Sequence, residues 1–191
     1  MSKETNIVKG LKLEMRQVKD TLRIIIHSIL FQRELGVIVP RTVESEFGIQ
    51  YLTLNDAATD RTLEESIAAF ENKIVDQNSA TVVLSFYQCF KKKSFLVFQE
   101  NAKHVWEEWK IPIRIQHCMG EDSKKSDASL GKKIRKRLLA IIERICERKD
   151  HLPPMGEPDD PNVIRYPFDI TTLPDMSDNY YAKSIGLLSF G

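Results

Sequence analysis

The sequence predicts an α+β fold in which three helices pack on one face of a mostly antiparallel sheet. Three observations support this. Two strand-like segments flank a short connection between residues 80 and 116, and three other segments carry apolar residues at helical spacing. The chain has 191 residues, 42% of them hydrophobic, which is enough for one well-filled core. We therefore expect a single domain over residues 1–191.

The two strand-like segments are expected to form a long hairpin. The first arm, Thr81–Phe90, is rich in β-branched and aromatic residues, and the second arm has a large apolar residue at every other position from Trp109 to Ile115. Such a hairpin would set the register of the sheet. Glu107 and Glu108 lie between two tryptophans, and we expect them on the outward side of a turn.

The N-terminal part predicts one short strand and one helix. Residues 1–6 are expected to be frayed, and a half-buried strand is expected within Ile7–Met15. A helix should follow over Gln17–Leu35, with Gly36 as a left-handed cap. His27 falls within the apolar part of that helix, and we interpret it as a structural residue because no second ligand lies at helical spacing from it.

The next segment predicts two strands and a second helix. Val37–Val39 and Phe47–Leu54 have strand composition. Thr62 and Glu65 form a capping-box pattern at the start of a helix that continues to about Asp76. The helix should end at Asn78 and Ser79.

After the hairpin, residues 119–129 read as a flexible polar loop, and Leu130–Lys149 as a third helix. Leu152–Met155 contains two prolines that should stop this helix. The apolar line of the helix comprises Ile134, Leu138, Ile141 and Ile145, with Leu139 and Ile142 beside it.

The third helix is also strongly basic. Residues 124–149 include ten Lys or Arg residues and three acidic ones. This pattern fits a solvated outer face, a contact with an acidic partner surface or, less well, a contact with anionic lipid.

The C-terminal segment, residues 156–191, contains two weak strand candidates, Val163–Ile170 and Ala182–Phe190. They are separated by a polar stretch rich in turn-forming residues. We expect this segment to be mobile.

No catalytic constellation emerges from the sequence. The 28 basic and 27 acidic residues nearly cancel, the eight glycines are scattered singly, and the four histidines fall on different predicted elements. We therefore expect no enzyme activity, no cofactor and no metal. Three cysteines, no signal-peptide pattern and no apolar run of about 18 residues predict a soluble intracellular protein.

The tip of the hairpin is the remaining candidate for function. Phe95, Leu96 and Phe98 follow the run Lys91–Lys93. These three side chains either pack in the core or form an exposed apolar contact for a partner.

Several motifs occur in a recognisable order along the chain. They are His27-Ser-Ile-Leu-Phe-Gln-Arg33, Leu84-Ser-Phe-Tyr-Gln88, Lys91-Lys-Lys-Ser94, Trp106-Glu-Glu-Trp109 and Leu152-Pro-Pro-Met155. Taken together, this ordered set resembles the autophagy-related protein 101 family of HORMA-domain proteins.

The resemblance implies a HORMA fold and a non-enzymatic adaptor role. Family members heterodimerise with the HORMA domain of autophagy-related protein 13, stabilise it, and so join the kinase complex that starts autophagosome formation. This implies a cytoplasmic protein that acts at the phagophore assembly site. The family also carries a projecting Trp-Phe finger that recruits later factors. Here Phe98 holds the phenylalanine position, but Leu96 stands in place of the tryptophan.

We expect the heterodimer interface to use the first and third helices and the neighbouring sheet edges. The candidate residues are His27, Arg33, Arg137, Ile141 and Arg144. An alternative is a peptide-closing HORMA receptor of the spindle-checkpoint or meiotic-chromosome kind, which the weak strands of the C-terminal segment suggest.

Overall fold

The computed structural model describes residues 3–34, 36–91, 101–116, 123–153 and 166–174. It contains three helices and seven strands in this part of the chain. Their order is β1 (Glu4–Ile7), β2 (Leu11–Leu13), α1 (Met15–Gln32), β3 (Arg41–Glu44), β4 (Gln50–Thr53), α2 (Ala57–Gln77), β5 (Ser79–Lys91), β6 (Asn101–Ile115), α3 (Ser123–Glu147) and β7 (Phe168–Pro174).

The main sheet is organised around the predicted hairpin. Its strand order is β1-β6-β5-β7, and β2 also pairs with β6 further along that strand. The long pairings, β5 with β6 and β5 with β7, are antiparallel. The short pairings of β1 and β2 with β6 are parallel and were not predicted from the sequence. The sheet is therefore mixed but mostly antiparallel, and the α+β class is confirmed.

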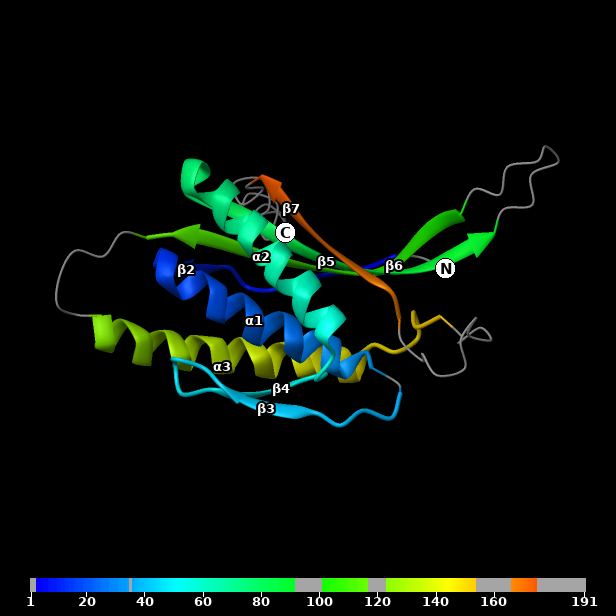
Figure 1. Cartoon of the computed structure of the whole chain (residues 1–191), viewed down its shortest axis with the longest axis horizontal. Coiled ribbons are helices and arrows are strands. Elements are labelled where there is room, and N and C mark those ends of the chain that lie inside the picture. Colours follow the sequence, from blue (N-terminus) through cyan, green and yellow to red (C-terminus); the bar gives the residue numbers. More distant parts are fainter. Residues whose placement is uncertain (1–2, 35, 92–100, 117–122, 154–165, 175–191) are drawn as a thin grey trace, which may run out of the picture.

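The helices form one layer against this sheet (Figure 1). Helix α1 contacts both α2 and α3, and the separate hairpin β3–β4 lies on the side of the helices away from the sheet. Alternate residues of β5 and β6 join one buried cluster with the apolar faces of all three helices. This arrangement is consistent with a HORMA-like domain.

Residues 4–6 belong to a strand, although a frayed end was predicted for residues 1–6, of which residues 1–2 lie outside the described part. Residues 4–7 form β1, and the Asn6 side chain is buried. Two ion pairs stabilise this short strand: Lys3 Nζ lies 2.6 Å from Glu108, and Arg148 Nη1 lies 3.0 Å from Glu4. The partners are more than 100 residues away, so the local sequence could not predict them.

Helix α1 begins and ends earlier than predicted. It begins at Met15, where the Glu14 N–H donates to Gln17 Oε1 at 2.9 Å, and it ends at Gln32. The cap is Arg33, with an ordinary negative φ, so the predicted left-handed cap at Gly36 is wrong. Arg33 leaves the helix because its guanidinium turns inward to bind Glu107.

The predicted strand at Val37–Val39 is also wrong. Strand β3 begins only at Arg41, after the predicted segment, and it pairs with β4 in an antiparallel hairpin. Strand β4 lies within the predicted Phe47–Leu54. Val37 is fully exposed and Val39 is largely exposed. Their β-branched composition predicted a strand, but no neighbouring strand is present among the described residues to pair with them.

Helix α2 begins one and a half turns before the predicted start at Thr62. Its cap is Asp56, whose side chain accepts from the Thr59 N–H at 2.9 Å. Thr62 lies inside the helix, where its hydroxyl donates to the Ala58 carbonyl at 3.0 Å. The predicted end is confirmed, because Asn78 adopts a left-handed conformation with φ 55°.

The loop predicted over residues 119–129 is helical from Ser123 onward, while residues 119–122 lie outside the described part. Contacts with α1 fix these first turns of α3. Asp127 accepts from Arg16 at 2.9 and 3.0 Å and from Gln17 Nε2 at 2.6 Å. The polar composition indicated a loop, but its side chains bind another helix.

The C-terminal segment is only partly described. Phe168–Pro174 forms β7 and pairs with β5 over seven residues, so this part is held in the sheet, slightly later than the predicted Val163–Ile170. The second strand candidate, Ala182–Phe190, lies outside the described residues, as do the hairpin tip and Cys118. Mobility of residues 156–165 and 175–191, and the peptide-closing alternative that depends on it, stay predictions.

Candidate functional site

The outward face of α3 carries exposed apolar side chains. Ile134, Ile141 and Ile145 are buried, as the helical spacing predicted. Leu139 and Ile142, however, are 61% and 39% exposed. Both were predicted to lie beside the buried line, but each is rotated too far around a helix of 3.6 residues per turn to reach the core.

Basic residues precede this apolar pair along α3. Four exposed Lys or Arg side chains lie on the preceding turns of α3: Lys132, Lys133, Arg135 and Lys136. Arg135 bridges to the turn before β4, because its Nη2 donates to the Gly48 carbonyl at 2.7 Å. The helix therefore presents an amphipathic outer surface with a positive first half.

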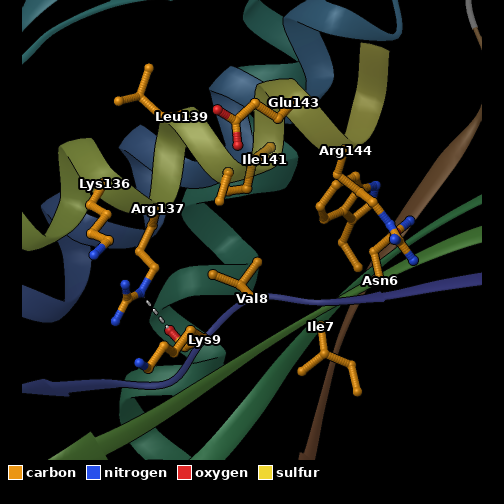
Figure 2. Close-up of a pocket in the computed structure, with 12 residues that line it drawn as sticks. Asn6, Ile7, Val8, Lys9, Lys136, Arg137, Leu139, Ile141, Glu143 and Arg144 are labelled. Atoms are coloured by element: carbon orange, nitrogen blue, oxygen red, sulfur yellow. Dashed lines mark hydrogen bonds between the residues drawn. The ribbon is translucent and has the colours of Figure 1, made fainter. Parts of the chain in front are cut away.

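A cleft of about 700 Å³ lies between α3 and β1 (Figure 2). Val8, directly after β1, and Ile141 of α3 approach one another across this cleft. Twelve residues line it: Asn6, Ile7, Val8, Lys9, Trp109, Lys136, Arg137, Leu139, Ala140, Ile141, Glu143 and Arg144.

Two arginines of α3 hold the helix against the N-terminal strand at this cleft. Arg144 Nε donates to Asn6 Oδ1 at 2.8 Å, and Arg137 Nε donates to the Lys9 carbonyl at 3.0 Å (Figure 2). Arg144 also lies 3.3 Å from Glu4. The cleft thus has fixed walls, an apolar floor and a basic rim, which suits it to binding another polypeptide.

The structure brings together three of the five predicted interface residues. Arg137, Ile141 and Arg144 all line the cleft. His27 and Arg33 do not belong to this surface, because both side chains are buried inside the chain. We therefore correct the predicted set by removing these two residues.

Arg33 belongs instead to a buried cluster centred on Glu107, whose side chain is 0% exposed. Arg33 donates to the carboxylate through Nε at 3.0 Å and Nη2 at 2.8 Å. His151 Nε2 lies 2.6 Å from Glu107 Oε2, and the Trp109 indole N–H also donates to this carboxylate. The prediction that Glu107 faces outward from a turn is wrong.

The position of Glu107 follows from the alternation of β6. Counting back by two from Ile111 and Trp109, which face the core, gives Glu107. This signal was present in the sequence, but the charge of the side chain argued against burial. Trp106 is buried as well, because the pairing skips it: Phe86 pairs with Glu107 and Tyr87 with Val105.

The Glu107 cluster connects segments that are far apart in sequence. It joins the end of α1, strand β6 and the turn after α3. Close to it, Tyr166 stacks edge-on against Trp106 with ring centroids 4.7 Å apart, and its hydroxyl donates to the Pro153 carbonyl at 3.0 Å. Both described ends of the segment 154–165 are therefore anchored at the same place.

His27 occupies a second buried polar site, between α1, α2 and the hairpin β3–β4. Its ring lies 5.9 Å from the Tyr51 ring, and its Nε2 lies 3.8 Å from Asp60. Its Nδ1 has no hydrogen-bond partner among the described residues. Burial lowers the pKa of His27, and this outweighs the opposing attraction of Asp60 and Glu64, while Arg23 and Arg41 lower it further.

We predict that this histidine makes the fold acid-sensitive. Because the pKa of His27 is lowered in the folded state, the unfolded chain takes up the proton first as the pH falls through about 6.5. The free energy of unfolding should therefore fall between pH 7.5 and 5.5. The lowered pKa values of Glu64 and Asp127 act only at lower pH, since their ordinary values are 4.5 and 3.8.

Urea unfolding of the wild type and of His27→Gln at both pH values measures this effect. The pH-dependent loss should be smaller in the variant, whatever its stability at pH 7.5. Equal losses in the two proteins would show that His27 does not cause the acid sensitivity.

Within the described residues, no group of three His, Cys, Asp or Glu side chains is placed to hold a metal ion. Cys89 and Cys146 are free and exposed. Among the described helices, none is long and apolar enough to cross a membrane.

The comparisons with known proteins all indicate the same family. The sequence profile described as "Autophagy-related protein 101" matches residues 10–159. The autophagy-related protein 101 of Arabidopsis thaliana is 30% identical, with 97% of this chain and 94% of the relative covered. The Xenopus tropicalis protein of that name is 24% identical over 93% of this chain and 86% of its own length. The Homo sapiens protein is 22% identical, with 78% and 74% covered. The profile and the Arabidopsis relative both span most of the sequence, and the chain therefore belongs to the autophagy-related protein 101 family.

Proposed function

We propose that this protein is a non-enzymatic adaptor that heterodimerises with the HORMA domain of autophagy-related protein 13 and stabilises it. Family membership supports a role in autophagy. The observation that carries the finer proposal is the exposed apolar pair Leu139 and Ile142 on α3, which a lone monomer would leave in water. Through that partner, the protein joins the autophagy-initiating kinase complex as a scaffold.

The α3 surface has the features of a protein–protein interface. Leu139 and Ile142 supply an apolar centre, and the basic residues around them supply a charged rim. A standard interface buries about 1,600 Å² in total, about half of it on each partner, and the outer face of a 25-residue helix is long enough to supply this chain's share. Arg137 and Arg144 lie at the border of this surface.

The proposal predicts that acidic substitutions at the apolar pair abolish pairing. Leu139→Asp with Ile142→Asp should prevent co-elution with the partner HORMA domain after co-expression, because two charges would be buried at the centre of the interface. Ser129→Asp is a control for the effect of a single added charge, because it lies at another exposed position of α3.

The thermal melting point of each variant alone should stay close to that of the wild type, because the substituted side chains face solvent. Wild-type co-elution by the double variant would exclude this face as the interface. Failure of the wild-type chain itself to co-elute would refute the heterodimer.

The proposal also includes a location in the cell and a second binding site on the protein. The heterodimer acts in the cytoplasm and at the phagophore assembly site. The tip residues Phe95, Leu96 and Phe98 recruit later autophagy factors in this proposal. They lie outside the described residues, so their role rests on the sequence alone.

A further inference from the structure

We propose that the cleft between β1 and α3 binds an extended, acidic segment of another polypeptide, which adds to the sheet as a strand beside β1. The proposal rests on three features of the described residues: the free edge of β1, the apolar floor of the cleft and the positive charge at its rim.

The backbone of β1 has an edge that is available for pairing. Within the described part of the chain, β1 pairs with β6 alone. The Val8 N–H donates to the Lys110 carbonyl at 2.9 Å, so Val8 faces β6. In a parallel pairing, successive residues alternate in direction, and Thr5, Ile7 and Lys9 therefore turn their N–H and C=O groups away from β6.

A side-chain contact supports this assignment of direction. The Lys9 carbonyl accepts from Arg137 of α3, which places it on the cleft side of the strand (Figure 2). The backbone N–H and C=O groups of Thr5 and Ile7 point to the same side of the strand as the Lys9 carbonyl. An extended peptide can pair with such an edge, whereas a helix cannot, because its backbone groups bond internally.

The floor of the cleft provides room for apolar side chains. Val8, Trp109 and Ile141 are buried at its base. At the rim, Ile7 and Leu139 are 50% and 61% exposed. Side chains on an added strand alternate in direction, so every second residue of the segment would meet this apolar surface. The four residues of β1 set the length of a matching segment at about four to six residues.

The charges at the rim select an acidic segment. Four basic residues line the cleft against one acidic residue, Glu143. Arg137 and Arg144 already bond to Lys9 and Asn6, so they position the walls. The exposed side chains of Lys9 and Lys136 remain for the carboxylates of the segment.

This inference does not depend on the proposed heterodimer. The heterodimer rests on the outward pair Leu139 and Ile142, of which Leu139 also lies at the rim of the cleft. Strand addition rests on the edge of β1 and on Lys9, which is not on α3. A single partner that uses both surfaces is compatible with the two proposals, and different variants test each of them.

The experiment measures the fluorescence anisotropy of labelled ten-residue peptides mixed with the full chain. The probe alternates Glu and Val. One control peptide alternates Lys and Val, and a second keeps the probe sequence but carries N-methyl groups on alternate backbone nitrogens. We expect the probe to bind at least about tenfold more tightly than either control. Equal binding of the N-methylated peptide would overturn strand addition.

Substitutions locate the site. Lys9→Glu and Lys136→Glu should each weaken probe binding by about tenfold or more, because each replaces an attraction by a repulsion. Lys132→Glu makes the same charge change on an exposed position of α3 outside the cleft, and should change binding by less than about twofold.

Three outcomes would overturn the proposal. They are an absence of probe binding, equal effects of all three lysine variants, and competition by inorganic polyphosphate as strong as that by unlabelled probe. The last would show that the rim binds negative charge without an extended backbone. If the partner HORMA domain co-elutes while the probe fails to bind, only this inference falls. If the probe binds and the partner does not co-elute, only the proposed function falls.

Discussion

Glu107→Leu is expected to destabilise the protein by about 3 to 5 kcal/mol, because it leaves the Arg33 guanidinium buried without a counter-charge. The carboxylate accepts hydrogen bonds from Arg33 and Trp109 and lies 2.6 Å from His151 Nε2. Leucine matches the volume approximately but accepts none of these bonds. Urea unfolding at pH 7.5, followed by circular dichroism, measures the loss.

The double substitution Arg33→Leu with Glu107→Leu is the informative control. Removing both charges eliminates the unpaired cation, so the double variant should be more stable than Glu107→Leu alone. If the double variant loses the sum of the two single losses, the ion pair has no coupling energy. In that case, packing would account for the role of Glu107.

This cluster also explains how the ends of a long segment are held. His151 and Pro153 follow α3, whereas Tyr166 precedes β7, yet all three meet beside Trp106 and Glu107. The cluster therefore anchors both described ends of residues 154–165.

The elements with strong local periodicity could be predicted from sequence. The hairpin of β5 and β6 and the inward lines of α1, α2 and α3 follow directly from alternation or helical spacing. Strand β1 and the first turns of α3 could not be predicted in this way. Their polar residues are held by partners about a hundred or more positions away, such as Glu4 by Arg148 and Asp127 by Arg16.

Part of the candidate site could likewise be predicted from the sequence, and part of it could not. Arg137, Ile141 and Arg144 were predicted on α3 and lie together in the cleft. The cleft itself could not be predicted, because one of its walls is β1. The parallel pairing of β1 with β6 joins residues about a hundred positions apart. His27 and Arg33 were included in the predicted interface because they lie on or next to the first helix, but tertiary contacts bury both side chains.

Trp106→Ala is expected to cost about 3 to 5 kcal/mol, because it opens a large cavity where the strand pairing is irregular. Trp106 is fully buried and contacts three rings, with centroid distances of 5.6 Å to Phe86, 4.7 Å to Tyr166 and 5.8 Å to His151. Aromatic pairs of this kind add about 0.5 to 1.5 kcal/mol beyond the area that they bury.

Trp106→Phe separates the contribution of the ring from that of its polar N–H. The Trp106 indole nitrogen has no hydrogen-bond partner among the described residues, so phenylalanine removes a buried, unpaired donor while keeping an aromatic ring. This variant should therefore lose much less stability than Trp106→Ala in the same urea experiment. Equal losses would show that the smaller phenylalanine ring cannot fill the site, so that the full volume of the indole is needed at the bulge.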